Sequence, residues 1–172
     1  MGMYKYLTKL WQDAKGKIKP IQKERIIKWR KQPSIVRLDK PTRIDKARRL
    51  GYKAKQGFII VRARIKKGGR NRRSIPKGRR PKRYGMRHFS PTKSLQAIAE
   101  LRVNKRFPNL EVLNSYYVGD DSQHVWYEII MVDKNHPSIE KDKDVEWIIC
   151  QRKRAFRGLT SAGKNSRNSR RK

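Results

Sequence analysis

Residues 110–132 read LEVLNSYYVGDDSQHVWYEIIMV, and this stretch decides the fold. Two runs rich in β-branched and aromatic residues, Leu110–Val118 and His124–Val132, flank the five residues Gly119–Gln123. Such residues favour strands, and Gly-Asp-Asp-Ser is common in turns. The stretch therefore predicts a β-hairpin, whose two strands pair in antiparallel fashion.

Helical patterns lie on both sides of this hairpin. Ser90-Pro91 predicts the start of a helix, because the first helical turn tolerates proline, and Pro108 lies beyond its end. Apolar residues then recur at helical spacing: Leu95, Ile98, Ala99 and Leu101, with Arg102 next in the pattern. After the hairpin, short helical turns are predicted around 137–140 and 144–149.

Further upstream, residues 57–66 alternate between two sides, as in a strand. One side carries Ile59, Val61, Ala63 and Ile65, and the other carries Ile60, Arg62, Arg64 and Lys66. This predicts a strand that leaves the body with one basic face. A short helix is predicted over 42–51, with Thr42 as N-cap and Gly51 in the left-handed position after its end. Residues 34–38 read as a short strand.

The segment before residue 34 reads as two helices, 3–11 and 20–31, ended by Gly16 and Pro33. The elements together predict the α+β class. We expect a helical segment over 1–33 that packs on or beside the body and a single α+β body over 34–150. A long basic loop over 66–89 interrupts that body, and an extended basic tail follows over 151–172.

Charge is distributed very unevenly along the 172 residues, whose formal net charge is +33. Leu95–Cys150 holds ten acidic and six basic residues, a balance of −4, whereas the rest holds 41 of the 47 Lys and Arg and 4 of the 14 Asp and Glu, a balance of +37. Strongly basic segments repel themselves and are condensed by a polyanion. This pattern is typical of a nucleic-acid-bound protein.

The densest basic region is Arg62–Arg87, with 13 basic residues in 26 and no acid. Its glycines and prolines forbid the continuous amphipathic helix of a membrane-surface binder. No zipper, zinc-finger ligand set or clear helix-turn-helix is present, so irregular arms favour folded RNA over duplex DNA. The N-terminal residues lack the apolar run of a signal peptide, which favours an intracellular protein.

Three patterns resemble catalytic or metal motifs, and each has a simpler interpretation. Gly119-Asp120-Asp121 is similar to a magnesium-binding aspartate pair, but it lies in the predicted hairpin turn. Ser90-x-x-Lys93 lacks its companion motifs, and Asp133 with His136 precedes a proline in a predicted loop. Cys150 is the only cysteine, so neither an internal disulfide nor a zinc ligand set is available. We predict no enzymatic activity.

Several longer strings resemble one family. They are Leu50–Gly57, Lys67–Arg70, Val112–Gly119 and Phe156–Lys164, joined by Met3–Tyr6 and Pro41–Arg48. They are similar to large-subunit ribosomal protein fifteen of the archaeal–eukaryotic type, which is unrelated to the bacterial protein of the same number, and the resemblance covers the chain in order. It implies a cytoplasmic, structural component of the large ribosomal subunit, bound to its ribosomal RNA. It also implies an α+β body with a four-stranded antiparallel sheet in β-(α)-β-α-β-β order and helices on its faces, the order of elements that the sequence patterns give.

The expected contacts with ribosomal RNA lie on the predicted helix 42–51, the residues after it, the loop and the tail. They are Arg43, Lys46, Arg48, Arg49, Tyr52, Lys53, Lys55, Gln56, Arg62, Arg64, Lys66, Lys67, Gly68, Gly69, Arg70, Arg72, Arg73, Lys77, Arg79, Arg80, Lys82, Arg83, Arg87, His88, Arg152, Lys153, Arg154, Arg157, Lys164 and Arg167.

Other partners are expected to be few. Neighbouring large-subunit proteins are candidates to contact the acidic hairpin end at Asp120 and Asp121, and neither a membrane partner nor a homo-oligomer is predicted. No cofactor is predicted, although structural Mg²⁺ or K⁺ at the RNA interface is compatible with the sequence. Two alternatives stay open from the residues alone: a DNA-compacting chromatin protein, and an RNA-modifying or RNA-cleaving enzyme.

Overall fold

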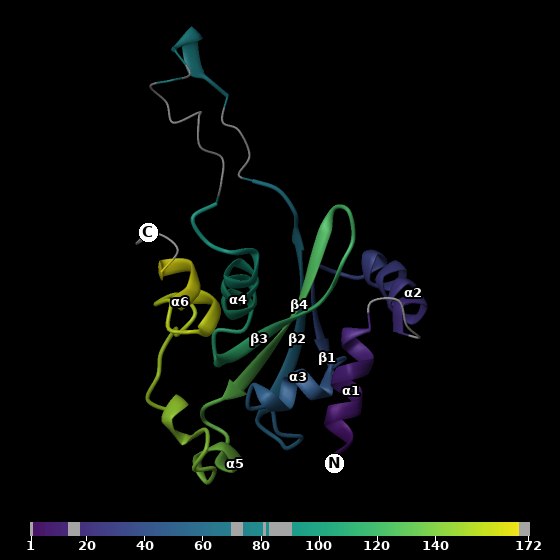
Figure 1. Cartoon of the computed structure of the whole chain (residues 1–172). Helices are drawn as coiled ribbons and strands as arrows, with labels where there is room; N and C mark the ends of the chain where they lie inside the picture. The colour runs from purple at the N-terminus through teal and green to yellow at the C-terminus, as the bar shows by residue number, and fades with distance from the viewer. Residues whose placement is uncertain (1, 14–17, 70–73, 81, 83–90, 169–172) are drawn as a thin grey trace.

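The centre of the molecule is the hairpin of β3 (Leu110–Asp120) and β4 (His124–Asp133), seen here in a computed structural model (Figure 1). The structure describes residues 2–13, 18–69, 74–80, 82 and 91–168. The Asp121 carboxylate accepts hydrogen bonds from the backbone N–H groups of Gln123 (2.7 Å) and His124 (2.5 Å), which closes the turn. The predicted hairpin is confirmed, and each strand runs slightly past its predicted end.

Two more strands complete a four-stranded antiparallel sheet in the order β1-β2-β4-β3. β1 (Ile35–Leu38) pairs with β2 (Phe58–Lys66), and β2 pairs with β4 along its full length, from Phe58 opposite Val132 to Lys66 opposite His124. The α+β class and the four-stranded antiparallel sheet are therefore confirmed.

Helix α4 (Leu95–Arg106) covers one face of the sheet (Figure 1). Its Val103 and Ala99 are fully buried against inward-facing side chains of β2 and β4, among them Val61 and Met131. The helix begins later than Ser90-Pro91 predicts. The side chain of Ser94 accepts a hydrogen bond from the backbone N–H of Ala97 (3.2 Å) and caps the first turn.

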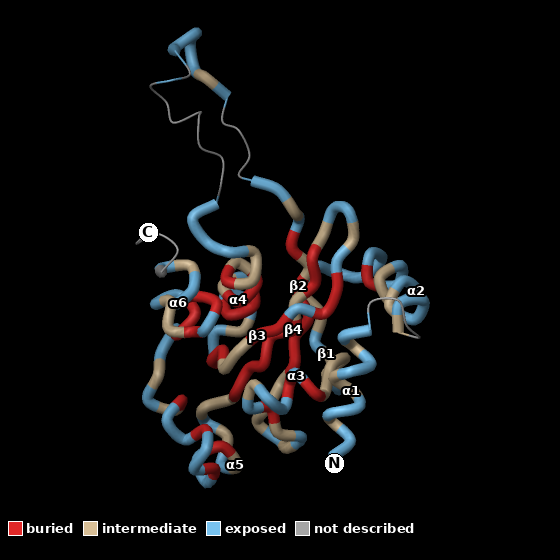
Figure 2. Tube along the Cα trace, in the orientation of Figure 1, coloured by how far each residue is buried: buried red, intermediate tan, exposed pale blue. Residues whose placement is uncertain are grey.

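The other face is covered by α2 (Ile18–Lys31) and α3 (Ile44–Arg49), and α1 (Met3–Gln12) packs against α3. Trp29 of α2 packs with Trp126 of β4, their ring centroids 6.0 Å apart, beside Ile60 of β2. Both sheet faces are thus buried, as the red segments of Figure 2 show. Each strand therefore carries apolar side chains on both sides at its centre.

The predicted C-terminal end of α3 is confirmed, and its predicted N-cap is wrong. Gly51 has φ of +94°, the left-handed conformation expected after a helix. Thr42 does not cap the helix, because its backbone N–H (3.0 Å) and its hydroxyl both donate to the carboxylate of buried Glu128 on β4. This contact ties the start of α3 to the sheet.

The end of the chain differs from the expected extended tail. After α5 (Pro137–Glu140) and a short 3₁₀ turn (Glu146–Ile148), residues 151–168 return to the body and end in α6 (Ser161–Asn168) beside α4. Arg154, Thr160 and Ala162 are buried. Cys150, by contrast, is exposed rather than packed in a core.

Candidate nucleic-acid interface

Helix α3 presents Lys46, Arg48 and Arg49 to solvent. Two of these cations also hold α1 against the body. The guanidinium of Arg48 lies 5.4 Å from the ring centroid of Tyr4, and Arg49 donates a hydrogen bond to the hydroxyl of Thr8 (2.9 Å). This surface therefore combines exposed charge with structural contacts.

Arg43 is half-buried just before α3. Its guanidinium lies 4.7 Å from the ring centroid of Trp11 and is 3.2 Å from the carboxylate of buried Asp45. Much of its charge is therefore directed into the contact between α1 and α3.

Tyr52, Lys53 and Lys55 serve the fold more than the surface. Tyr52 is buried against Phe58, with the rings edge to face and their centroids 6.0 Å apart. The ammonium of Lys53 is 2.7 Å from Asp142 and 2.6 Å from Asp144, and that of Lys55 is 2.5 Å from Asp142.

These ion pairs shift the pKa of the groups that form them. Hydrogen bonds from Lys53 and Lys55 lower the pKa of the Asp142 carboxyl to about 2, and the bonds to Asp142 and Asp144 raise the pKa of Lys53. Gln56 is exposed next to this cluster.

The cations in the outer half of β2 differ in how far they are buried. Arg62 is 6% exposed, lies 4.3 Å over the ring of Trp29 and donates to the Gln32 side chain (2.5 Å); desolvation lowers its pKa. Arg64 donates to the backbone carbonyl of Arg30 (2.7 Å). The expected basic face of this strand is therefore exposed mainly at Lys66, where the strand ends.

The acidic hairpin end holds the start of the basic loop. Lys67 forms an ion pair with Asp120 and donates its backbone N–H to the carbonyl of Gln123 (2.7 Å). The hydrogen bonds from Lys67 and then Tyr117 lower the pKa of Asp120. Asp121 accepts from Arg30 (2.8 Å), and its side chain is only 7% exposed. Both carboxylates thus have partners within the chain.

The loop beyond Lys67 is described in part. Gly68 and Gly69 are exposed, and so are Lys77, Arg79, Arg80 and Lys82. Six expected contact residues lie outside the described residues: Arg70, Arg72, Arg73, Arg83, Arg87 and His88.

The C-terminal segment places five of its six expected contact residues on the surface: Arg152, Lys153, Arg157, Lys164 and Arg167. The sixth, Arg154, is 8% exposed and donates to the backbone carbonyls of Val112 (2.5 Å) and Leu113 (3.1 Å). Its guanidinium also lies 4.6 Å from the ring centroid of Trp147. Arg154 therefore acts inside the fold.

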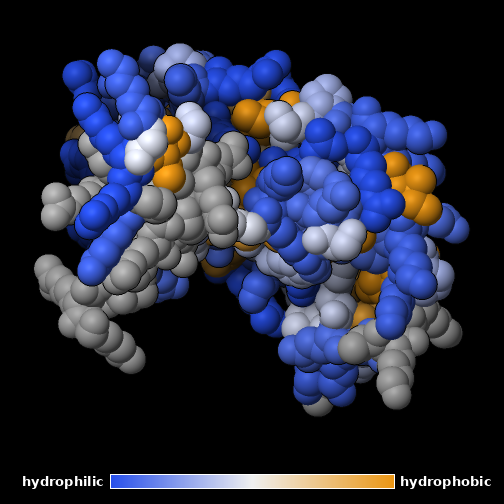
Figure 3. All heavy atoms as spheres, turned by 90° about the horizontal axis from the view of Figure 1, so that it is seen from above, coloured by the Kyte–Doolittle hydropathy of each residue, from blue (hydrophilic) through white to orange (hydrophobic). Residues whose placement is uncertain are grey.

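Lys93 and Arg102 are among the exposed cations that do not belong to the expected contacts. Lys93 precedes α4, and Arg102 follows Leu95 and Ile98 on one face of that helix. The helical spacing could have revealed Arg102, which continues the apolar stripe with a charge. On the face that Figure 3 shows, hydrophilic side chains prevail and hydrophobic ones form small separate patches.

Two further observations concern the described residues as a whole. Within the part of the chain that the structure describes, no three His, Cys, Asp or Glu side chains gather to hold a metal ion. No helix among those same residues is long and apolar enough to span a membrane.

A comparison with known protein families gives a match that covers almost the whole chain. The family model described as Ribosomal L15 matches residues 2–172. Proteins of this family are structural, non-catalytic components of the large ribosomal subunit in the cytoplasm, so neither the chromatin protein nor the enzyme applies. The chain therefore belongs to this archaeal–eukaryotic family of large-subunit ribosomal proteins, as its sequence strings predict.

Proposed function

We propose that this ribosomal protein binds folded large-subunit ribosomal RNA through exposed cations on α3, the basic loop and the C-terminal segment, and holds RNA segments against the sheet body. One observation carries the proposal: several carboxylates are buried or paired within the fold, whereas most of the described cations remain on the surface. Glu128 accepts from Thr42 and Tyr116, Glu111 from the backbone of 153 and 154, and Asp120 from Lys67.

The surface that remains is strongly positive. Cations from three distant parts of the chain are exposed, including Lys46, Lys77 and Lys164. Isolated exposed cations gain little from one another and repel, whereas a phosphate backbone neutralises them and releases counterions. The proposal therefore accounts for the net charge of +33 without any catalytic group.

The test compares two triple variants that lose the same charge. K46A/K77A/K164A removes exposed cations from the proposed interface, and K134A/K141A/K143A removes three from the acidic region around α5. Binding to large-subunit ribosomal RNA is measured from low to high salt. The wild-type log–log slope is expected to be steep, because each phosphate contacted contributes about −0.7 to −0.9.

The interface variant is expected to flatten that slope by about two to three units, and the control variant to leave it unchanged. Equal effects of the two variants would mean that net charge alone governs binding. A wild-type slope near zero would contradict RNA binding by these cations altogether.

A further inference from the structure

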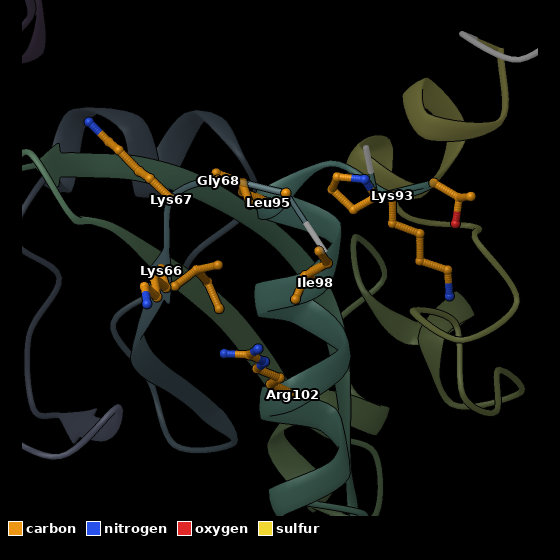
Figure 4. A pocket seen from close by; sticks show the side chains of 11 residues that line it. Lys66, Lys67, Gly68, Lys93, Leu95, Ile98 and Arg102 are labelled. Atoms are coloured by element: carbon orange, nitrogen blue, oxygen red, sulfur yellow. The ribbon is translucent and has the colours of Figure 1, made fainter. Parts of the chain in front are cut away.

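A hollow of about 690 Å³ lies where the end of β2 passes the first half of α4 (Figure 4). Its apolar lining comes from Ile65 on the strand and from Leu95 and Ile98 on the helix. Ile65 is 2% exposed, but Leu95 and Ile98 are only partly buried, so the hydrophobic core is incompletely covered here. Its volume falls in the range of about 300–1,000 Å³ that small-ligand sites occupy.

Cations surround this apolar lining. Lys66 and Arg102 are exposed lining residues, and no carboxylate lines the hollow within the described part of the chain. Lys93 also lines the hollow, but its side chain points away from Leu95 and Ile98 in Figure 4. Figure 4 shows the side chain of Arg102 reaching from α4 toward the strand that carries Lys66. Lys67 also lines the hollow, but it is paired with Asp120 on the hairpin.

Two glycines leave one side of the hollow without side chains. Gly68 has φ of +103°, and no atom of the described residues lies within 4 Å of the position that a Cβ would occupy there. Gly69 follows it, and both are exposed at the point where the basic loop leaves the sheet. The hollow is thus continuous with the surface proposed to bind RNA.

The apolar lining, the cationic edge and the lack of an acid among the described lining residues together indicate which class of ligand fits the hollow. The described lining residues offer no carboxylate, histidine or cysteine ligand for a metal ion. An acid-rich peptide would pair with the cations but would make no apolar contact with Ile65, Leu95 and Ile98. A nucleotide matches both parts, because its base has an apolar face and its phosphate carries negative charge. Proteins commonly bind RNA bases that are unpaired and unstacked, because only these bases expose their faces.

We propose that this hollow receives one unpaired nucleotide of the large-subunit ribosomal RNA, with the base against Ile65, Leu95 and Ile98 and the phosphate near Lys66 and Arg102. This inference rests on the proposed function and adds to it a site for a single extruded base. It assigns Arg102 and Ile98, outside the basic arms, to RNA recognition.

The first test separates the apolar and the cationic parts by salt titration of RNA binding. R102A is expected to flatten the log–log slope by about 0.7 to 0.9, because one phosphate contact is lost. I98A is expected to weaken binding about three- to tenfold with the slope unchanged, because only apolar contact is lost. L101A is the control for Ile98: Leu101 packs against the same core but does not line this hollow, and its RNA affinity should equal that of wild type.

The second test avoids the core. A photoreactive amino acid replaces exposed Thr92 at the edge of the hollow, and crosslinks are mapped in assembled large subunits. We expect one dominant ribosomal RNA nucleotide, with a yield lowered by I98A or R102A and kept by R106A, which alters an exposed residue at the other end of α4. Removal of that nucleotide's base should weaken wild-type binding and not I98A binding.

The outcomes distinguish this inference from the proposed function. If RNA binding keeps its steep salt dependence but I98A behaves as L101A does, the hollow holds no base and the proposed function stands. Crosslinks to protein, or crosslinks spread over many nucleotides, also overturn the inference. If the wild-type protein shows no salt-dependent RNA binding, the proposed function fails and the site fails with it.

Discussion

The basic loop (66–89) and the C-terminal segment (151–172) have similar compositions but different structures. Both are rich in Lys and Arg, and neither contains an acidic residue. Among the described loop residues 74–80 and 82 none is buried, whereas Arg154, Thr160 and Ala162 of the C-terminal segment are buried against the body (Figure 2).

The C-terminal segment is partly buried because carboxylates of the body accept hydrogen bonds from it. Glu111 accepts hydrogen bonds from the backbone N–H groups of Lys153 (2.6 Å) and Arg154 (3.2 Å), and Glu100 accepts from the hydroxyl of Thr160 (2.5 Å). Both glutamates are buried, and desolvation raises the pKa of Glu100. A basic segment therefore folds onto this body where buried carboxylates and backbone carbonyls accept its hydrogen bonds.

The largest expected effect is the loss of Arg154. R154A removes the bonds to the carbonyls of Val112 and Leu113 and the electrostatic attraction between buried Arg154 and both Glu100 and Glu111. The free energy of unfolding should therefore fall by about 3–5 kcal/mol. The measurement is urea denaturation, with limited proteolysis of the C-terminal segment beside it. R157A is the control, because Arg157 is exposed; equal losses in the two variants would contradict the anchoring role of Arg154.

A smaller effect is expected from G163A. A Cβ on Gly163 would lie 2.7 Å from the Cα and 2.9 Å from the carbonyl carbon of Gly158, both backbone atoms that cannot move aside alone. The backbone shift needed to relieve such overpacking costs about 1–3 kcal/mol. Thermal unfolding should show it, with α6 as the first proteolytic site. G2A serves as the control, since no atom of the described residues lies within 4 Å of a Cβ at that position. Unchanged stability of G163A would mean that α6 does not pack closely on the turn at Gly158.

A third prediction concerns the ion pairs that buried Asp142 forms with the half-buried Lys53 and Lys55. The pKa of Asp142 is about 2 in the folded protein, below its usual value, because Lys53 and Lys55 favour the carboxylate. The folded state therefore binds fewer protons than the unfolded state between about pH 4 and pH 2. Its contribution to stability is present above pH 4 and is lost as the pH falls through that window.

The variant D142N removes this pH dependence. Denaturation midpoints of D142N should fall less than those of wild type between pH 5 and pH 2, and D39N, which alters an exposed carboxyl, should follow the wild-type curve. Parallel curves for D142N and wild type would show that the pairs with Lys53 and Lys55 do not stabilise the fold.

How much the sequence predicts depends on how local the cause is. The hairpin turn at Asp121 and the left-handed Gly51 were predictable, because alternation and turn chemistry act within a few residues. The folding of the C-terminal segment was not, because Glu111 and Glu100 lie 42 and 60 residues from their partners Lys153 and Thr160. The local composition of the segment cannot indicate a hydrogen-bond partner that is so distant in the sequence.

The same reasoning explains the candidate site. Arg62 and Arg154 look like Arg48 in the sequence, yet the first two are buried in contacts with Trp29 and Val112, and Arg48 is exposed. Conversely, Arg102 is exposed but belongs to the segment of balance −4, where local charge density does not indicate an RNA contact. Which arginine remains available to RNA is decided by tertiary burial, not by local charge density.

The smallest effect on stability is expected at Gly68, where the loop departs. G68A adds a Cβ into open space but forces a non-glycine residue to φ of +103°, which should cost about 1 kcal/mol, at the low end of the range for backbone strain. G68E should cost the same in unfolding and, in addition, reduce incorporation into large subunits, since its carboxylate would face the phosphates proposed to lie there.

The pair of variants isolates charge from backbone strain, so their difference in incorporation reports RNA contact at the loop base. Normal incorporation of G68E would remove this point from the interface. It would also mean that the loop, unlike the anchored C-terminal segment, contributes its charge only beyond Gly69.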